Sequence, residues 1–267
     1  MKKIMTLAAI FAAVMMGVTS CNPDDTKPEQ KPDVETPDNG GEETPDNGGE
    51  ETPDNGGEEP EPTAAITIDG DFSDWDALEG AVVATLPEGD VKYEQLKTFK
   101  MYADEEFIYI FCEYDPENTL VFVPYFDLDS NPATGNDSKW SGAGYEAKAE
   151  GSIYDDSVEG VQGEPKPWDP TFYYYGEPET VLESGMATTS CTPVEYKNGN
   201  WAFEASILRE ILIDSYASAF ADTATDKFTV GMIQYNLDWD YIGQLPTKTL
   251  AEIEAGEKEP MLTVTLP

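Results

Sequence analysis

The sequence predicts an all-β domain built as an antiparallel β-sandwich, and three observations carry this prediction. Strand-like runs rich in β-branched and aromatic residues follow one another at short spacing after residue 63. Only one stretch, residues 208–216, has the apolar spacing of a helix. The roughly 205 residues from Thr63 onward suffice for one domain with a sizeable core. Many short strands with little helix favour two packed antiparallel sheets.

Residues 1–20 predict an export signal. Lys2 and Lys3 give a positive start, and residues 4–18 are almost wholly apolar but too few to span a membrane comfortably. Ser20 and Cys21 end this stretch, and a small residue before such a cysteine resembles the lipobox of bacterial lipoproteins. The resemblance implies that Cys21 becomes the mature N-terminus and carries acyl chains, palmitate among them, that anchor the protein in a bilayer. The alternative is an ordinary secretory signal with an unrelated cysteine.

The first residues after Cys21 bear on where the protein is anchored. The acidic pair Asp24 and Asp25 resembles the surface-export signal of Bacteroidetes lipoproteins. This resemblance implies an outer-membrane lipid anchor with the protein exposed at the cell surface.

Residues 21–62 predict a disordered acidic linker behind the lipidated cysteine. The sequence Glu-Thr-Pro-Asp-Asn-Gly-Gly-Glu occurs three times in succession, starting at Glu35, Glu43 and Glu51. No apolar residue in the repeat can stack into a shared core, and the carboxylates repel one another. The segment is therefore expected to act as an extended spacer. Loose Ca²⁺ scavenging is the alternative role.

Charge and composition exclude several partners. The chain has 54 acidic and 15 basic residues, a formal net charge of −39. Residues 22–62 hold 15 of the acids and two lysines, and two more lysines belong to the signal, so 39 acids and 11 bases remain in the domain, a charge of about −28. This surface repels nucleic acid and anionic membranes, which excludes both as partners, and it favours neutral or cationic ligands.

The absence of histidine and the presence of two cysteines in the domain limit the chemistry. The chain has no histidine, which removes the commonest general base and most zinc sites. Cys112 and Cys191 are the cysteines beyond the anchor. An oxidising envelope would permit a disulfide between them, and two buried free thiols are the alternative.

Within the domain, the strands are predicted from apolar alternation and from β-branched and aromatic content. Residues 144–154 alternate as in a strand with one wet face, and residues 104–106 form a polar turn. Residues 197–200 contain Asn-Gly, which accepts the positive φ of a hairpin turn. The predicted strands are residues 65–68, 81–86, 97–103, 107–114, 119–126, 144–154, 171–175, 185–196, 201–207, 228–236 and 261–266.

Three segments in the same order resemble one family. Residues 68–75, Ile-Asp-Gly-Asp-Phe-Ser-Asp-Trp, resemble the I-D-G-x-x-x-D-W opening of family 9 carbohydrate-binding modules and related DOMON-like sandwiches. Residues 100–110 resemble the family's A-D-D-x-x-L-Y-I hairpin, and residues 200–207 its G-W-x-x-E-x-x-I strand, with Leu208 where proline is usual. The resemblance implies a jelly-roll-type sandwich, often with structural Ca²⁺, and it favours sugar binding without proving it. Trp75 and Trp201 lie in these motifs and are expected to pack in the core.

Loop aromatics beside polar residues are the candidate sugar contacts. An aromatic face covers the apolar side of a pyranose, while carboxylates bond its hydroxyls. The alternative is that these rings close hydrophobic gaps. The candidates are Trp140, Trp168, Trp239, Tyr173, Tyr175, Asp238 and Asp240.

Residues 127–137 give the sharpest local motif. Asp127 and Asp129 point the same way in the strand-like part, and a turn at Pro132 can bring Asn131 beside them. Converging hard oxygens suit a structural Ca²⁺. The motif is not an EF-hand, because Ser138 stands where the twelfth-position glutamate belongs. An Asx-stabilised turn without metal is the alternative.

The leading functional hypothesis is a non-catalytic glycan-binding lipoprotein that holds an oligosaccharide or polysaccharide for neighbouring outer-membrane uptake proteins. A cell-surface adhesion or assembly protein that binds another protein is the first alternative. A glycoside hydrolase with a carboxylate pair is the second, since two carboxylates roughly 5–10 Å apart can do that chemistry without histidine.

Overall fold

The computed structural model describes residues 64–175, 180–183, 187–214 and 226–267. The predicted signal peptide, Cys21 and the whole predicted linker precede them and lie outside the described residues. None of the described helices is long and apolar enough to span a membrane.

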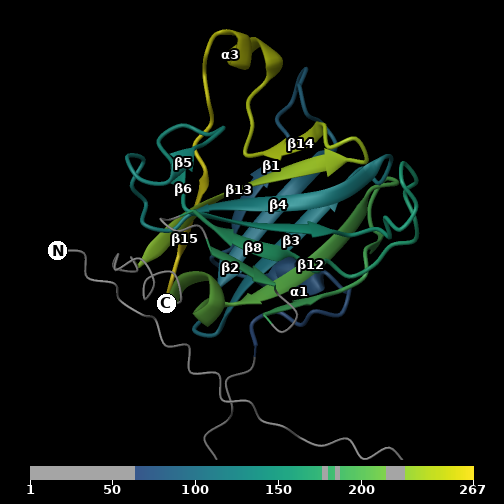
Figure 1. Ribbon diagram of the computed structural model, residues 1–267, viewed down its shortest axis with the longest axis horizontal. Coiled ribbons are helices and arrows are strands. Elements are labelled where there is room, and N and C mark those ends of the chain that lie inside the picture. Colours follow the sequence, from purple (N-terminus) through teal and green to yellow (C-terminus); the bar gives the residue numbers. More distant parts are fainter. Residues whose placement is uncertain (1–63, 176–179, 184–186, 215–225) are drawn as a thin grey trace, which may run out of the picture. The chain divides into compact units, whose positions relative to one another are not determined.

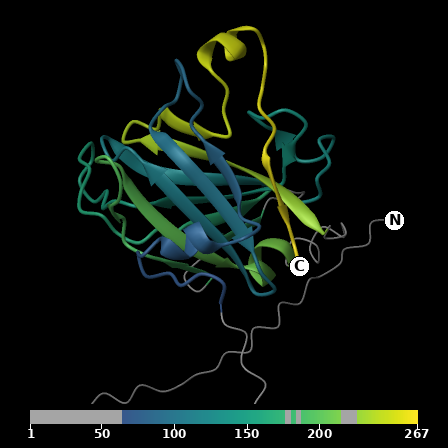
Figure 2. The ribbon, with the colours of Figure 1, turned by 180° about the vertical axis from the view of Figure 1, so that it is seen from behind.

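Two antiparallel sheets make up the domain, which confirms the predicted all-β sandwich (Figures 1 and 2). Sheet A has the order β1 (Val82–Thr85), β2 (Leu96–Ala103), β3 (Phe107–Tyr114), β12 (Trp201–Leu208) and β10 (Thr188–Ser190), with β11 (Val194–Glu195) also on β12. Sheet B has the order β14 (Tyr241–Leu245), β13 (Lys227–Asn236), β4 (Thr119–Asp127), β7 (Ala147–Ser152), β8 (Thr171–Tyr174) and β9 (Thr180–Glu183), with β15 (Leu262–Thr265) also on β13. A small ribbon pairs β5 (Asn136–Asp137) with β6 (Gly144–Tyr145).

Within the described residues, helical structure is confined to short pieces. They are α1 (Ser73–Ala77), α3 (Leu250–Glu254) and a π-helical turn, η1 (Glu210–Asp214). The helix predicted over 208–216 is therefore only this turn within the described residues, because β12 continues to Leu208.

Aromatic side chains join the two sheets. Phe122 of β4 lies 5.0 Å from Tyr114 of β3 and 5.1 Å from Phe203 of β12, measured between ring centroids. Edge-to-face packing of this kind adds to the free energy of burying the rings. The core thus lies where β3 and β12 face β4.

Sheet A also carries a second apolar layer, on its outer side (front of Figure 2). The segment before β1 lays Ile66, Phe72 and Trp75 over Tyr109 and Phe111 of β3. Strand β3 is therefore buried on both faces, which explains why residues 107–114 form a continuous apolar run instead of alternating.

Glu204 ties this outer layer to the sheet. Its Oε1 accepts hydrogen bonds from the amides of Asp69 and Gly70 at 3.0 and 2.8 Å, and its Oε2 accepts one from Trp75 Nε1 at 3.0 Å. Two of the three motifs that resemble one family, residues 68–75 and 200–207, thus meet at one buried carboxylate. Trp75 is buried as predicted.

Most strand predictions are confirmed. Strand β3 has the predicted bounds, and β2, β4, β12 and β13 agree with theirs to within one residue at each end. At the predicted hairpin turn, Asn198 and Gly199 have φ of 55° and 82°. Two predictions are wrong: residues 65–68 form no strand, and residues 187–196 hold only β10 and β11.

Candidate functional site

Two of the predicted sugar-binding tryptophans are buried, which corrects that prediction. Trp168, 2% exposed, packs between the sheets over Gly151 and donates from Nε1 to Phe122 O at 3.3 Å. Trp140, 3% exposed, lies over Gly231 of β13 and donates to Pro246 O at 2.8 Å. Each ring fills the space left by a glycine, so both tryptophans close hydrophobic gaps.

Trp239 is the exception, with 52% of its surface exposed. It lies at the tip of the β13–β14 hairpin with φ of 62°. Asn236 fixes this tip, because its Oδ1 accepts the amides of Asp238 and Asp240 at 2.9 and 2.8 Å. Both aspartates are exposed beside the ring. The hairpin therefore presents a large aromatic face and two carboxylates to solvent.

A band of tyrosine rings continues from Trp239 across the outer face of sheet B, which is turned toward the viewer in Figure 1. Strand alternation directs Tyr125 of β4 and Tyr173 of β8 outward, since Phe122, Phe126 and Phe172 of these two strands face the core. We call this band the tyrosine face; its members are Tyr125, Tyr145, Tyr173, Tyr175, Tyr235 and Tyr241.

Ring contacts link most of the tyrosine face. Tyr235 lies 5.7 Å from Trp239 and 4.9 Å from Tyr241, between centroids. The hydroxyls of Tyr235 and Tyr125 are 3.0 Å apart, and Tyr125 lies 4.8 Å from Tyr145, which lies 5.3 Å from Tyr175. Burial raises the pKa of Tyr125 to about 12, so its phenol stays neutral and can donate a hydrogen bond.

Charged side chains are set among these rings. Lys148 of β7 lies 4.6 Å from the ring centroid of Tyr173 and pairs with Glu150 at 2.6 Å. All three are half-buried. The face therefore combines flat apolar surfaces with donors and acceptors, which is the combination that a sugar ring requires.

A group of three carboxylates lies where β4 ends, next to the tyrosine face. Asp127, Asp129 and Glu146 each place a carboxylate oxygen within 4.8 Å of the others. Asp127 is 0% and Glu146 2% exposed. Both oxygens of Asp127 and Oε1 of Glu146 are buried without a hydrogen-bond partner among the described residues. A buried, charged carboxylate without a hydrogen-bond partner costs folding free energy, so these carboxylates are expected to bind a proton or a cation.

Burial dominates the ionisation of this group. Together with the nearby charge of Asp129, it raises the pKa of Asp127 to about 6 and that of Glu146 to about 8. Nearby donors of Ser130, Asn131 and Thr229 lower the pKa of Asp127. None of them makes a hydrogen bond of ordinary geometry to its carboxylate.

The loop after β4 closes over these carboxylates. Asp129 accepts the amide of Asn131 at 2.8 Å and the hydroxyl of Thr134 at 2.8 Å. Gly135, with φ of 66°, approaches so closely that an added Cβ would lie 2.3 Å from Oε1 of Glu146. The predicted ligand Asn131 is exposed, and its Oδ1 already accepts the amide of Ala133 at 3.1 Å.

Glu146 is the residue that the sequence reasoning missed. The β4–β7 ladder brings it beside Asp127, because Glu146 N donates to Phe126 O at 2.9 Å and Leu128 N donates to Glu146 Oε2 at 2.8 Å. The available signal was a single acid that follows Tyr145 at the start of an alternating strand, which does not distinguish it from solvent-facing acids.

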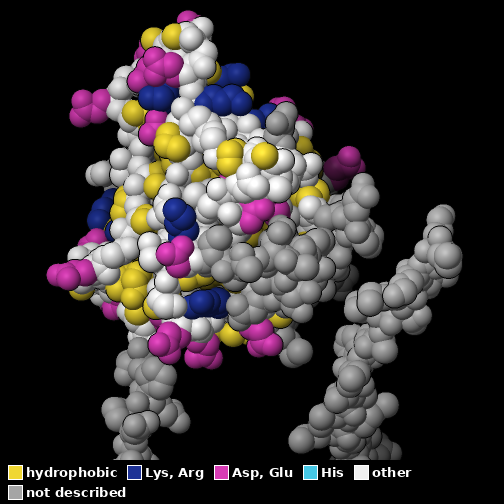
Figure 3. All heavy atoms as spheres, turned by 90° about the vertical axis from the view of Figure 1, so that its left-hand side faces the viewer, with side chains coloured by type: hydrophobic (Ala, Val, Ile, Leu, Met, Phe, Trp, Pro, Cys, Tyr) yellow, Lys and Arg dark blue, Asp and Glu magenta, His cyan; other side chains and the backbone are white. Residues whose placement is uncertain are grey.

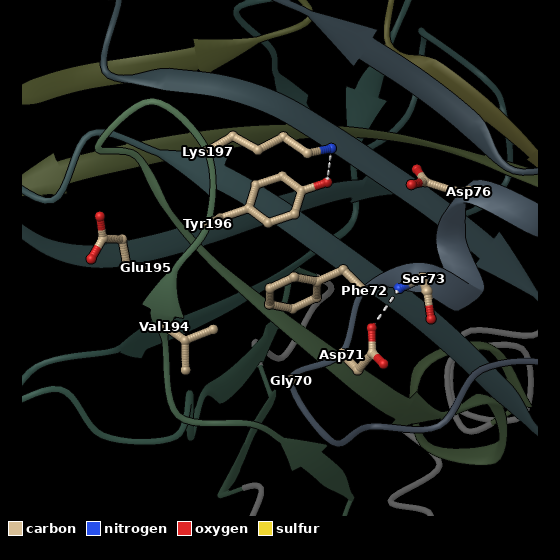
Figure 4. Close-up of a pocket in the computed structure, with 9 residues that line it drawn as sticks. All are labelled: Gly70, Asp71, Phe72, Ser73, Asp76, Val194, Glu195, Tyr196 and Lys197. Atoms are coloured by element: carbon tan, nitrogen blue, oxygen red, sulfur yellow. Dashed lines mark hydrogen bonds between the residues drawn. The ribbon is translucent and has the colours of Figure 1, made fainter.

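A hollow of about 380 Å³ lies on the outer side of sheet A, beside α1 (Figure 4). Phe72 and Tyr196 form an apolar wall, where Lys197 donates to the Tyr196 hydroxyl. Asp71 and Asp76 stand at its rim. Phe72 and Tyr196 are the only described aromatic residues that line this hollow, so it offers less aromatic surface than the tyrosine face and is the weaker candidate for a sugar.

The two cysteines are free thiols. Burial raises the pKa of Cys112 well above its usual value and that of Cys191 to about 11, so neither is a reactive thiolate at neutral pH. Cys191 Sγ instead accepts the amide of Glu204 at 3.3 Å.

No protein-family model matches the chain, and a comparison with curated proteins finds no relative.

Proposed function

We propose that this chain is a non-catalytic carbohydrate-binding lipoprotein of the bacterial cell surface. Cys21 carries the lipid anchor in the outer membrane, residues 22–62 act as the spacer, and the sandwich binds an oligosaccharide or polysaccharide beside uptake proteins. The observation that carries the proposal is the tyrosine face of sheet B, a chain of rings that are half-buried except for the buried Tyr235 and that ends at the exposed Trp239. Such rings cover the apolar side of a sugar, and their hydroxyls bond to it.

The burial of the acidic groups favours binding over hydrolysis. Asp127, Glu146 and Glu204 are the described carboxyls whose pKa is raised, as a general acid requires. None is more than 2% exposed. A glycosidic bond cannot reach a carboxyl buried in this way, so these groups support a binding role and not a hydrolase.

The test uses the protein from residue 22 onward, a glycan array, and calorimetry on the hits. We expect W239A and the double variant Y173A/Y175A each to weaken binding by about tenfold, since an aromatic stacked on a ligand contributes on the order of 1–3 kcal/mol. Y196A, in the hollow of Figure 4, is the matched control and should leave binding unchanged. An array without hits contradicts the proposal, and loss of binding in Y196A alone would move the site to sheet A.

We propose further that the three carboxylates hold one Ca²⁺. The structure fits this ion, because the oxygens converge and three of the buried ones have no described partner. Oxygen-only donor sets suit Ca²⁺, whereas zinc sites commonly draw on cysteine or histidine, which this group lacks. Asp127, Asp129 and Glu146 would hold the ion, whose charge would compensate theirs. Its role would be to brace the loop 129–135 and strand β6, which carries Tyr145 of the tyrosine face.

Calcium removal tests this second proposal. If Ca²⁺ binds only the folded protein, a free concentration 100 times Kd adds about 2.7 kcal/mol, which raises Tm by roughly 5–10 °C for a domain of this size. We expect D127N and E146Q to lose this rise over the EDTA-treated protein, while E79Q, an exposed acid elsewhere, keeps it. Equal Tm with Ca²⁺ and with EDTA in the unaltered protein would contradict the proposal.

A further inference from the structure

Four lysines line one hollow of about 150 Å³ between α3 and β14. Lys92 precedes β2, Lys139 lies between β5 and β6, and Lys248 and Lys258 flank α3. Figure 3 shows Lys and Arg side chains close together just below the tip that carries α3. We call this site the cationic hollow; its lining includes the four lysines with Tyr93 and Gln244.

The concentration of positive charge contrasts with the domain as a whole. The domain keeps 11 basic residues against 39 acidic ones, and four of the 11 meet at this hollow. They come from three separate chain segments, so the fold and not a local sequence run gathers them. An average surface of this composition repels anions, but here the local sign is reversed.

Among the described residues, acidic neighbours pair with only one of the four lysines, and the four lysines and three glutamates together leave a net charge of +1. Lys248 pairs with Glu252, Glu257 and Glu259 at 3.4, 3.5 and 3.1 Å. Of these, Glu257 and Glu259 also line the hollow. The ion pairs of Lys248 therefore hold α3 and its flanking turns together.

The other three lysines form no ion pair with a described carboxylate. Lys139 Nζ lies 5.3 Å from the ring centroid of Tyr241, and Lys92 Nζ lies 5.0 Å from that of Tyr93. Lys258 Nζ donates to Ser138 O at 3.4 Å. All three side chains are exposed. An anion in the hollow would supply the counter-charge that these lysines lack.

The cationic hollow is continuous with the tyrosine face. Tyr93, in its wall, lies 6.0 Å from Tyr241, which lies 4.9 Å from Tyr235. Lys139 sits over that same Tyr241 ring. A chain of sugars on the tyrosine face can therefore extend one residue into the hollow.

We propose that the cationic hollow binds the carboxylate or sulfate of an acidic sugar, so that the ligand is an anionic glycan. This inference rests on the proposed function and specifies its ligand class. The overall negative charge of the domain favours neutral ligands, whereas this hollow is proposed to bind an anion.

The test screens uronic-acid oligosaccharides, sulfated oligosaccharides and neutral oligosaccharides against the protein from residue 22 onward. Calorimetry then compares a uronic-acid hit with its carboxyl-reduced form, which keeps the sugar skeleton but loses the charge. We expect the acidic form to bind at least about fivefold more tightly, a preference that weakens as salt rises because exposed charges are screened. A sulfated hit with no uronic-acid hit would assign the hollow to sulfate esters.

The variant K92Q/K139Q/K258Q should remove that preference and leave the affinity for the carboxyl-reduced form unchanged. The control K166Q/K197Q/K227Q removes three charges elsewhere and should keep the preference. Lys166 is half-buried and the other five lysines are exposed, so thermal unfolding is expected to show all variants folded. Hits that are all neutral and insensitive to K92Q/K139Q/K258Q would overturn this inference while the proposed function stands. No glycan binding at all would overturn both.

Discussion

At the scale of single residues, the domain contains two kinds of buried carboxylate. Glu204 is fully buried, and its two oxygens accept three hydrogen bonds from the segment before β1. Asp127 is equally buried, and neither of its oxygens has a described partner. A satisfied carboxylate belongs to the architecture, whereas an unsatisfied one points to a missing cation or proton.

The first prediction concerns Glu204→Gln. The amide oxygen can still accept from Asp69 and Gly70, but the amide nitrogen then faces Trp75 Nε1, which is also a donor. One buried donor is left unsatisfied, which should lower the free energy of unfolding by about 1–3 kcal/mol.

Urea denaturation followed by circular dichroism measures this change. Glu88→Gln, at an exposed position, is the control and should shift stability by less than about 0.5 kcal/mol. Equal stability of the Glu204→Gln variant and the parent protein would show that the contacts of Glu204 do not hold the outer layer on sheet A.

Individual residues also show which parts of the candidate site the sequence predicts. Asp127 and Asp129 were found because they are neighbours in the chain, but Glu146 joins them only through strand pairing. Trp140 and Trp168 were assigned to a ligand because they lie beside polar residues. The glycines that make room for their rings, Gly231 and Gly151, are far away in sequence or on another strand. Strand register determines which side chain faces which gap, and the local amino-acid composition does not predict the register.

At the scale of elements, prediction succeeded where a strand is long and rich in aromatic or β-branched residues, as in β3, β4 and β13. It failed for β14, which is short and contains Gly243 against Leu96 and Gln234. For residues 65–68 a strand was predicted where none forms. Ile66 is buried against the outer face of sheet A, but it pairs with no described strand. Apolar alternation reports burial, and burial does not require pairing.

The packing of Trp140 on β13 gives the second prediction. An alanine at Gly231 would place its Cβ 2.3 Å from the Trp140 ring, so Gly231→Ala should cost about 1–3 kcal/mol of stability by overpacking. Trp140→Ala should cost about 3–5 kcal/mol, because it empties a buried site and removes the bond to Pro246 O.

A double-mutant cycle in urea separates this contact from other effects. In the Trp140→Ala background the added methyl meets no ring, so Gly231→Ala should then be close to neutral, and the two costs should not add. The same cost for Gly231→Ala in both backgrounds would mean that β13 rejects the methyl for a reason other than Trp140.

At the scale of the whole molecule, the candidate carbohydrate-binding site and the candidate cation site both lie on sheet B. The tyrosine face crosses sheet B, Asp127 ends one of its strands, and the cationic hollow lies beside the β14 edge. Sheet A is buried on its outer side by the segment before β1 instead. The division explains why most rings of the tyrosine face on sheet B are half-buried and available, while Tyr109 and Phe111 of sheet A are buried.

The last prediction follows from the net charge of the domain, about −28 when the 11 bases are set against the 39 acids. Folding brings these carboxylates closer together than they are in the unfolded chain, so their repulsion lowers stability at low ionic strength. Salt screens exposed charges beyond about 10 Å at 0.1 M, and Tm should therefore rise by several degrees, on the order of 5 °C, between 10 mM and 500 mM NaCl. The measurement is made in EDTA throughout, so that no bound cation contributes. A Tm that falls with salt would mean that the few ion pairs, such as those of Lys248, outweigh the repulsion among the acids.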